Sequence, residues 1–421
     1  METPREYFKR QAKNGLIFLR WCVFGAIIGV TVGAAGAGFH HALDWAGETR
    51  DHHWALLYLL PVVGIIIAFL YEKADLPLER GTNFILTSVR ENHPVRLRMA
   101  PLIVVGTVLT HLCGGSAGRE GAALQLGGSI SGNIGHWMRL DDRDARTITM
   151  CGMAAGFTAL FGTPLAAVVF AMEVISVGVM YYAALFPCVL SAMIARLVAA
   201  RLGVFAKEYA IMGVPSGDAV GVAVLVRLTV LGVLCAVFAA LVCILFHRIG
   251  GLLKRACPNR YLCIALGGVI VIALTLLLQT HDYNGAGMQV IERALLGQAS
   301  PLAFFWKLLF TAVTIGVGYK GGEIVPVFFM GATFGCVAGG LLGLTPSFSA
   351  ALGMVAVFCG VTNSPLTSMF LAYELFGGSG LPMYAYVIAI AYMLSGYYGL
   401  YSEQKIIYSK MRPQFIDRKT K

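Results

Sequence analysis

Long apolar stretches separated by short polar segments fill most of this 421-residue chain. A bilayer core is crossed by a helix of about 20 apolar residues. Several of the apolar runs are far longer than this and rich in glycine, so we expect more than ten helical segments, some tilted, short or broken. The pattern therefore predicts an all-α polytopic membrane protein. The apolar runs cover residues 15–46, 54–71, 99–138, 147–200, 219–247, 261–280, 301–345 and 350–401.

Composition agrees with this pattern, because 57% of the residues are hydrophobic and 13% are charged, against about 25% charged residues in soluble domains. Much of the net charge of +10 lies at the two ends of the chain. Basic ends favour the cytoplasmic side, so we expect a multi-pass protein of the inner (plasma) membrane with both termini in the cytoplasm. Nucleic-acid binding is a poor explanation of that charge. The ten cysteines stand singly in apolar runs, so no disulfide framework, metal site or cofactor is expected.

The two halves of the chain share sequence anchors in the same order. FLRWCVFG at 18–25 matches LVRLTVLG at 225–232, and GTPLAAVVFAME at 162–173 matches NSPLTSMFLAYE at 363–374. We infer a duplication. Its expected parts are a cytoplasmic segment 1–14, membrane repeats 15–205 and 206–405, and a cytoplasmic basic tail 406–421, with no soluble regulatory domain.

Charge indicates how the repeats are oriented. The first span has its basic residues at the start, whereas the matching span at 219–247 ends in HRIGGLLKR. This swap favours an inverted repeat, with a parallel repeat as the alternative. Inverted repeats with broken helices are typical of transporters, whose sites lie where the halves meet.

Two glycine-rich stretches, 114–135 and 318–343, occupy matching places in the halves. Glycine lets the backbone approach a ligand closely, and free N–H groups at a helix start attract anions. Close helix packing is the alternative explanation. Glu120 and Glu323 stand at corresponding points of these stretches. A charge inside a bilayer costs at least ~2.5 kcal/mol, so we expect both carboxylates to handle protons and anions, rather than a purely structural Arg119–Glu120 ion pair.

Three further residues have competing interpretations. Glu173 and Glu374 end matching apolar helices and are expected to be boundary residues. Gly114–Ser116–Gly118 has the spacing of a serine nucleophile, which would need a histidine base. His111 lies five residues upstream, and the matching stretch VGYKGGE contains no serine. An intramembrane serine hydrolase at Ser116 is therefore a remote alternative.

Four motifs together resemble the CLC family of anion channels and anion/proton antiporters, over residues 15–405. They are GREG at 118–121, GGEIVP at 321–326, GTNFI at 81–85 and GLYSEQ at 399–404. The resemblance implies a homodimer with one pathway per subunit and Glu120 as the gating glutamate. It also implies an anion site formed by Gly118, Arg119, Gly121, Thr82, Asn83, Phe84, Gly322, Ile324, Val325 and Tyr401.

Departures from the chloride members point to one branch of that family. Thr82 replaces the usual serine, Ala122 replaces a proline, and Glu323 stands in place of an apolar residue. The internal proton glutamate of chloride exchangers would fall at about Val174 and is missing. These features are similar to the fluoride/proton antiporter branch. Some members of that branch carry a threonine where this chain has Val325. The resemblance therefore does not extend to a cation site that depends on that threonine.

The resemblance thus implies a proton-coupled fluoride exporter acting on fluoride and protons in a lipid bilayer. A chloride/proton exchanger or a passive anion channel is the alternative. Fluoride is small and strongly hydrated, so it needs close donors, which Thr82 or Asn83 and the Tyr401 hydroxyl could supply. The ring edge of Phe84 is a further candidate contact, with core packing as its alternative. Tyr401 could otherwise be an interfacial anchor.

Overall fold

A computed structural model describes residues 4–76, 78, 81–91, 95–215 and 221–421. Within these ranges the chain forms sixteen α-helices, so the expectation of more than ten helical segments is confirmed. The first eight are α1 (Pro4–His52), α2 (Leu60–Lys73), α3 (Gly81–Glu91), α4 (Met99–Leu112), α5 (Glu120–Trp137), α6 (Asp142–Phe161), α7 (Pro164–Glu173) and α8 (Leu185–Arg201). The second eight are α9 (Val222–Ala256), α10 (Arg260–Leu278), α11 (Met288–Leu295), α12 (Ala303–Gly316), α13 (Ile324–Leu341), α14 (Pro346–Thr362), α15 (Pro365–Phe376) and α16 (Leu381–Leu394).

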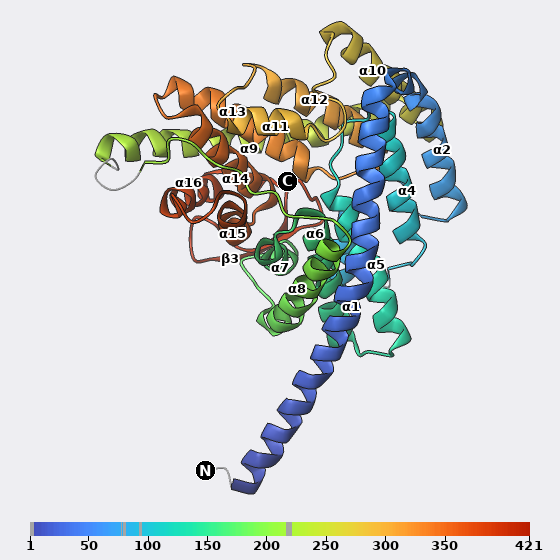
Figure 1. The fold of residues 1–421 in the computed structure, drawn as a ribbon, viewed down its shortest axis with the longest axis vertical. Helices are drawn as coiled ribbons and strands as arrows, with labels where there is room; N and C mark the ends of the chain where they lie inside the picture. The colour runs from blue at the N-terminus through green and yellow to red at the C-terminus, as the bar shows by residue number, and fades with distance from the viewer. Residues whose placement is uncertain (1–3, 77, 79–80, 92–94, 216–220) are drawn as a thin grey trace.

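Six helical segments in the described ranges are long and apolar enough to cross a membrane. They are Arg5–His52, Trp54–Lys73, Tyr182–Arg201, Val222–Ala256, Arg260–Leu278 and Ile324–Leu341. Shorter apolar helices, including α4, α7 and α12, lie among them. The N-terminal half of α1 extends well beyond the other helices (Figure 1). Short helices that end inside the protein are the broken segments predicted from the glycine-rich runs.

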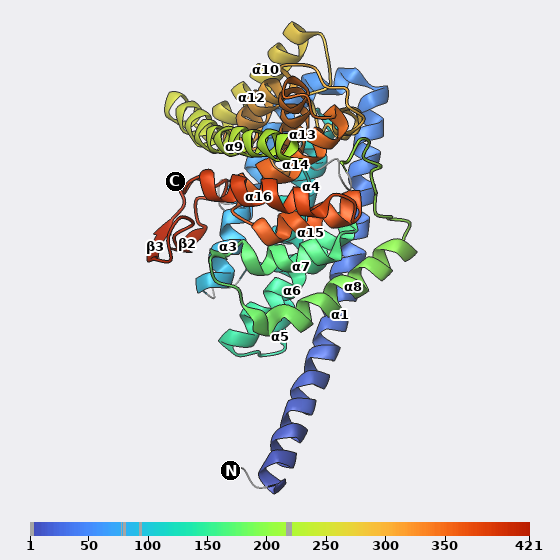
Figure 2. The same ribbon diagram turned by 90° about the vertical axis from the view of Figure 1, so that its left-hand side faces the viewer.

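The two sets of eight helices pair in the same way. Helix α5 packs against α6, and α6 against α1 and α8. In the second set, α13 packs against α14, and α14 against α9 and α16. Helices α7 and α15 pack on each other between the two groups, with α6 and α8 below and α13 and α14 above in Figure 2. The sequence duplication is therefore also a duplication of helix packing.

Two glutamates cap helix starts across this boundary: Glu374 at the end of α15 caps the start of α7, and Glu173 at the end of α7 caps the start of α15. Prolines open α7 and α15, and the following N–H groups lack partners inside the helix. Glu374 accepts hydrogen bonds from the N–H groups of Leu165 and Ala166, each at 2.9 Å. Glu173 accepts from Leu366 at 3.2 Å and from the N–H of Thr367 at 2.9 Å. Such reciprocal contacts are what a two-fold relation between repeats produces.

A small sheet is the one addition to the predicted all-α architecture within the described ranges. Strand β1 (Ser176–Val177) pairs in parallel with β2 (Lys405–Tyr408), which pairs antiparallel with β3 (Phe415–Lys419). The segment 406–421, predicted from its charge to be a basic tail, thus folds back as a hairpin on the membrane helices beside α3 (Figure 2). Ile406 is fully buried, so an apolar anchor holds the hairpin in place.

Candidate functional site

The two glycine-rich loops predicted to meet do so through a short backbone bridge. The N–H of Gly118 donates to the carbonyl of Gly322 at 2.6 Å, and the N–H of Gly322 donates back at 2.8 Å. A Cβ atom on Gly322 would lie 2.6 Å from the N atom of Gly121, which real Cβ atoms do not tolerate. Glycine is therefore required here because the two backbones approach more closely than any side chain allows.

This bridge also shows which residues of the two repeats are equivalent. Gly118 pairs with Gly322, and α5 starts at Glu120 where α13 starts at Ile324. Arg119 and Glu323 are therefore the equivalent residues, each at the N-cap of its helix. The expectation that Glu120 corresponds to Glu323 is wrong by one residue. Sequence anchors could not reveal this, because loop and helix lengths differ between the halves.

Glu120 reaches from the first repeat to the helix start of the second. Its carboxylate is fully buried, and Oε2 accepts hydrogen bonds from the N–H groups of Val325 and Arg119, each at 3.1 Å. Val325 lies in the first turn of α13, where free N–H groups and the helix dipole favour negative charge. The Glu120 carboxylate thus occupies a position suited to an anion.

Four buried polar atoms near this point have no hydrogen-bond partner among the described residues. They are Thr82 Oγ1, Glu120 Oε1, Glu323 Oε2 and the Tyr401 hydroxyl. A Cβ atom built on Gly121 would lie 2.7 Å from Thr82 Oγ1 and 3.4 Å from Glu323 Oε2, so these two converge. The Tyr401 hydroxyl interacts electrostatically with both carboxylates. An unpaired buried polar group costs about 1–3 kcal/mol, so four in one place indicate a site that a polar ligand or proton completes.

The remaining residues predicted for the site have varied positions. Gly121 and Ile324 are buried in the first turns of α5 and α13. Asn83 Oδ1 accepts from the N–H of Glu403 at 3.2 Å, so this side chain joins α3 to the segment after Tyr401. Phe84 packs, partly buried, against the main hydrophobic core. That packing is the alternative considered for Phe84.

Arg119 directs its guanidinium toward α1. Its Nη1 lies 3.1 Å from His40 Nδ1 and 3.7 Å from Asp44 Oδ1, and His40 Nε2 lies 3.1 Å from Asp44. Arginine can only donate, so His40 accepts at Nδ1 and carries its proton at Nε2. His40 and Asp44 were not predicted, although their spacing of four on one helix face is a visible signal.

Two adjacent cavities connect this network with the start of α13. One of about 760 Å³ is lined by Asp44, His111 and Arg119, among others. A smaller one of about 50 Å³ is lined by Arg119, Phe161 and Val325, among others. Arg119, Lys207 and Met288 line both cavities. The cavities therefore outline a route from the surface, past a cationic side chain, to the helix start that binds the Glu120 carboxylate.

A buried polar network, which Lys410 joins through a hydrogen bond to Asn363, lies on the Tyr401 side of the site. Gln404 is fully buried, and its amide donates to the carbonyls of Val174 at 2.9 Å and Thr362 at 2.8 Å. Asn363 donates to Gln404 Oε1 at 2.8 Å. The network therefore contacts the backbone of Val174, the position where the resemblance locates the internal glutamate of chloride exchangers. Gln404 and Asn363 stand in two of the quoted motifs, GLYSEQ and NSPLTSMFLAYE, but no role was predicted for either residue.

Ser116 is buried in a packing contact between loops and helices. Its hydroxyl lies 2.9 Å from Thr311 Oγ1, and its N–H donates to Thr314 Oγ1 at 3.1 Å. His111 Nε2 instead lies 3.3 Å from the carbonyl of Gly118. Among the described residues the serine hydroxyl is thus engaged by a threonine and has no histidine base, and the hydrolase alternative gains no support.

The chain matches the family model described as voltage gated chloride channel over residues 63–396. This chain belongs to the CLC family. It is 35% identical to the "Chloride/fluoride channel protein" of Pseudomonas syringae pv. tomato, over 96% of this chain and 90% of the relative. It is 26% identical to the "H(+)/Cl(-) exchange transporter ClcA" of Klebsiella pneumoniae, over 84% and 80% respectively.

Solved structures show the same fold for this CLC protein. A crystal structure of a CLC-type fluoride/proton antiporter superposes with a TM-score of 0.88 and 33% identity, covering 92% of this chain and 98% of that one. A slow cyanobacterial Cl⁻/H⁺ antiporter superposes with a TM-score of 0.79 at 20% identity, which bears on the fold alone. The predicted class, an all-α membrane protein with a CLC-like repeat, is confirmed.

Proposed function

We propose that this CLC protein exports fluoride from the cytoplasm in exchange for protons. One observation carries the proposal: the Glu120 carboxylate lies on the Val325 amide at the start of α13. A carboxylate held in an anion position can be displaced by an anion and can take up a proton once displaced. One group then couples the two flows, which is the requirement for exchange.

The surrounding groups suit that cycle. When fluoride reaches the start of α13, it replaces the Glu120 carboxylate on the Val325 N–H, and Glu120 leaves with a proton. Thr82 and Tyr401 each have a hydroxyl without a hydrogen-bond partner in the described part of the chain, so they can donate to the bound anion. A proton on Glu323 Oε2 would supply a further donor. These roles follow from the chemistry of the groups.

Fluoride fits this set of groups better than chloride does. Fluoride is a strong hydrogen-bond acceptor and the conjugate base of a weak acid, whereas chloride has almost no affinity for protons. A site with two carboxyl groups therefore brings fluoride and protons together. The relative that is 35% identical is named for chloride and fluoride, and the structure at TM-score 0.88 is a fluoride/proton antiporter. Both support the fluoride assignment.

The proposal also covers the orientation of the chain in the membrane and its assembly into a dimer. We place the protein in the plasma membrane with both ends of the chain in the cytoplasm, because those ends are basic. We also propose a homodimer. An apolar groove of about 570 Å³ runs between the exposed faces of α7, α15 and α16 and is lined by Leu165, Leu366, Met369, Phe370, Tyr373, Leu381, Pro382 and Ala385. A second copy of the same surface would fill it.

Flux from liposomes tests the proposed function directly. Purified protein is reconstituted into liposomes loaded with fluoride or chloride, and anion release and external pH are recorded together. We expect fluoride to leave much faster than chloride and to drive protons inward against their gradient. Equal rates for the two anions would refute the fluoride assignment. Fluoride release without proton movement would instead identify a passive channel.

A further inference from the structure

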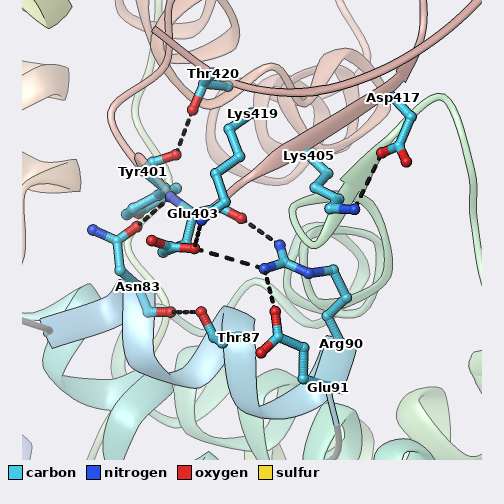
Figure 3. Close-up of polar contacts among 10 residues, drawn as sticks. All are labelled: Asn83, Thr87, Arg90, Glu91, Tyr401, Glu403, Lys405, Asp417, Lys419 and Thr420. Atoms are coloured by element: carbon cyan, nitrogen blue, oxygen red, sulfur yellow. Dashed lines mark hydrogen bonds and ion pairs between the residues drawn. The ribbon is translucent and has the colours of Figure 1, made fainter.

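The loop that carries Tyr401 is held from two sides, and one of them is a segment remote from the anion site. We call residues 399–404 the Tyr401 loop. On one side, α3 holds Glu403: Asn83 Oδ1 accepts from its N–H, and Arg90 donates to its carbonyl (Figure 3). Arg90 Nη2 also lies 3.6 Å from Glu403 Oε2. Thr82 also lies on α3. This helix therefore carries the Thr82 hydroxyl and holds the loop that carries the Tyr401 hydroxyl, and both hydroxyls lack a hydrogen-bond partner among the described residues.

On the other side, the segment after strand β3 closes over the loop. The Thr420 hydroxyl donates to the carbonyl of Tyr401 at 2.6 Å (Figure 3). The Thr420 N–H donates to the carbonyl of Gln404 at 3.0 Å. Lys419 Nζ lies 2.6 Å from Glu403 Oε2. Lys419 and Thr420 of the hairpin thus hold three residues of the Tyr401 loop, namely Tyr401, Glu403 and Gln404.

This contact is tight and mostly closed to water. Thr420 is 8% exposed. A Cβ atom on Gly399 would lie 2.8 Å from Thr420 Cγ2, so the threonine methyl group packs directly on the glycine backbone. Strand β3 is in turn held by β2, and β2 by β1 at the end of α7. The sheet therefore fixes the position of the Tyr401 backbone relative to the first repeat.

Within the described ranges, the Tyr401 ring itself makes no comparable polar contact. Its hydroxyl has no hydrogen-bond partner among the residues that the structure describes. The position of that hydroxyl therefore depends on ring packing and on the backbone carbonyl of the same residue. That carbonyl accepts from two donors, Thr420 Oγ1 and the N–H of Gln404. Removing the Thr420 donor acts on the backbone that aims the ring.

We propose that Thr420 is a positioning residue for transport: the 405–421 hairpin acts as a clamp that fixes the Tyr401 hydroxyl at the anion site. This rests on the proposed function, in which that hydroxyl binds fluoride. A loosened clamp lets the ring move away from the anion path. Fluoride then binds more weakly, and anions pass without a proton more often.

The substitution Thr420→Val tests this with little change of shape, since it keeps the methyl packing and removes only the hydroxyl. We expect the apparent KM for fluoride to rise roughly five-fold, as for the loss of one buried hydrogen bond, and fewer protons to move per fluoride. Thr420→Ser keeps the donor and should restore both values. Asp417→Asn is the matched control, because it breaks only the Lys405–Asp417 pair of the same hairpin and should transport like the wild type.

Glu403→Gln provides a second variant at a partly exposed position, so folding should be preserved. It removes the charge that Arg90 and Lys419 share, and we expect the same direction of change in KM and coupling. The clamp is refuted if both variants keep wild-type KM and coupling. It is also refuted if their total transport rate falls only in proportion to the amount of folded protein, with KM and coupling unchanged. If the wild type shows no fluoride/proton exchange, the proposed function fails instead, so the two failures are distinguishable.

Discussion

Individual glutamates in this protein differ because their oxygens meet different partners. Both carboxylate oxygens of Glu173 and Glu374 accept hydrogen bonds from helix N–H groups. Glu120 uses only Oε2, and its Oε1 has no partner within the described ranges. A carboxylate whose oxygens are all engaged is anchored, whereas one with a free oxygen can move and accept a proton. The residue type alone does not separate these roles.

The first prediction concerns Glu120. In Glu120→Gln, fluoride-driven proton movement should fall to the level of protein-free liposomes, because an amide can accept from the Val325 N–H but cannot carry a proton. The measurement is proton uptake during fluoride release. Glu48→Gln is the control, since Glu48 lines the larger cavity without touching the site. Wild-type coupling in Glu120→Gln would remove Glu120 from the mechanism.

The second prediction concerns Thr82, whose hydroxyl is buried without a partner in the described structure. Thr82→Val should leave thermal stability unchanged or higher, because no protein hydrogen bond is lost. It should raise the KM for fluoride about five- to ten-fold if the hydroxyl donates to the anion. Fluoride-dependent flux and thermal unfolding in detergent measure the two effects.

Thr87→Val is the matched control on the same helix, because its hydroxyl bonds the carbonyl of Asn83 at 3.0 Å. This variant should lower stability slightly and leave the KM unchanged. A normal fluoride KM in Thr82→Val would mean that the hydroxyl does not contact the anion.

At the scale of elements, the function depends on helices that end inside the protein. Helices α5 and α13 start at the Gly118–Gly322 bridge, and each directs its N–H groups toward the meeting point. Helices α7 and α15 start beside each other's end and are capped reciprocally by glutamates. The same two-fold relation therefore yields the proposed anion position at one pair of helix starts and a reciprocally capped joint at the other.

The third prediction tests that joint. Glu374→Gln keeps the size of the side chain but leaves one carbonyl oxygen to serve two N–H groups of α7. We expect a loss of about 1 kcal/mol in stability, as for a weakened helix cap, with unchanged fluoride selectivity. Thermal unfolding and the ratio of fluoride to chloride flux are the measurements. Glu208→Gln, at an exposed position, controls for the lost charge; a change in selectivity would contradict a purely structural role.

At the scale of the whole molecule, a single chain contains the complete candidate site. Thr82, Glu120, Glu323 and Tyr401 come from both repeats of one subunit. The apolar groove beside α7 and α15 lies on another part of the surface and shares no lining residue with the two cavities that reach Arg119. Transport and dimerisation should therefore be separable.

The fourth prediction follows from that separation. Leu366→Trp overfills the groove, so the protein should become monomeric in detergent while fluoride flux per milligram is retained. Light scattering combined with size-exclusion chromatography measures the mass. Leu225→Trp, on an exposed face of α9, should remain dimeric. A wild-type protein that is already monomeric would contradict the proposed homodimer.

Sequence reasoning was most reliable where a short pattern has one physical solution. Apolar runs of membrane length have to form buried or lipid-facing helices, so the helical class was predictable. The duplication was visible because Glu173 and Glu374 follow equivalent prolines at the same distance. Their capping roles were not visible, since each glutamate acts on a helix about 200 residues away in the chain.

The sequence by itself determined the membrane class, the repeat and the residue types near the two glycine loops. Only the tertiary structure decided that Glu120 lies on Val325, that Arg119 rather than Glu120 is equivalent to Glu323, and that Thr420 holds Tyr401. The physical reason is that composition and periodicity act along the chain, within a helix or a turn. Register between repeats, and contacts between distant segments, depend on how closely two backbones can approach, and that is set only when the halves pack together.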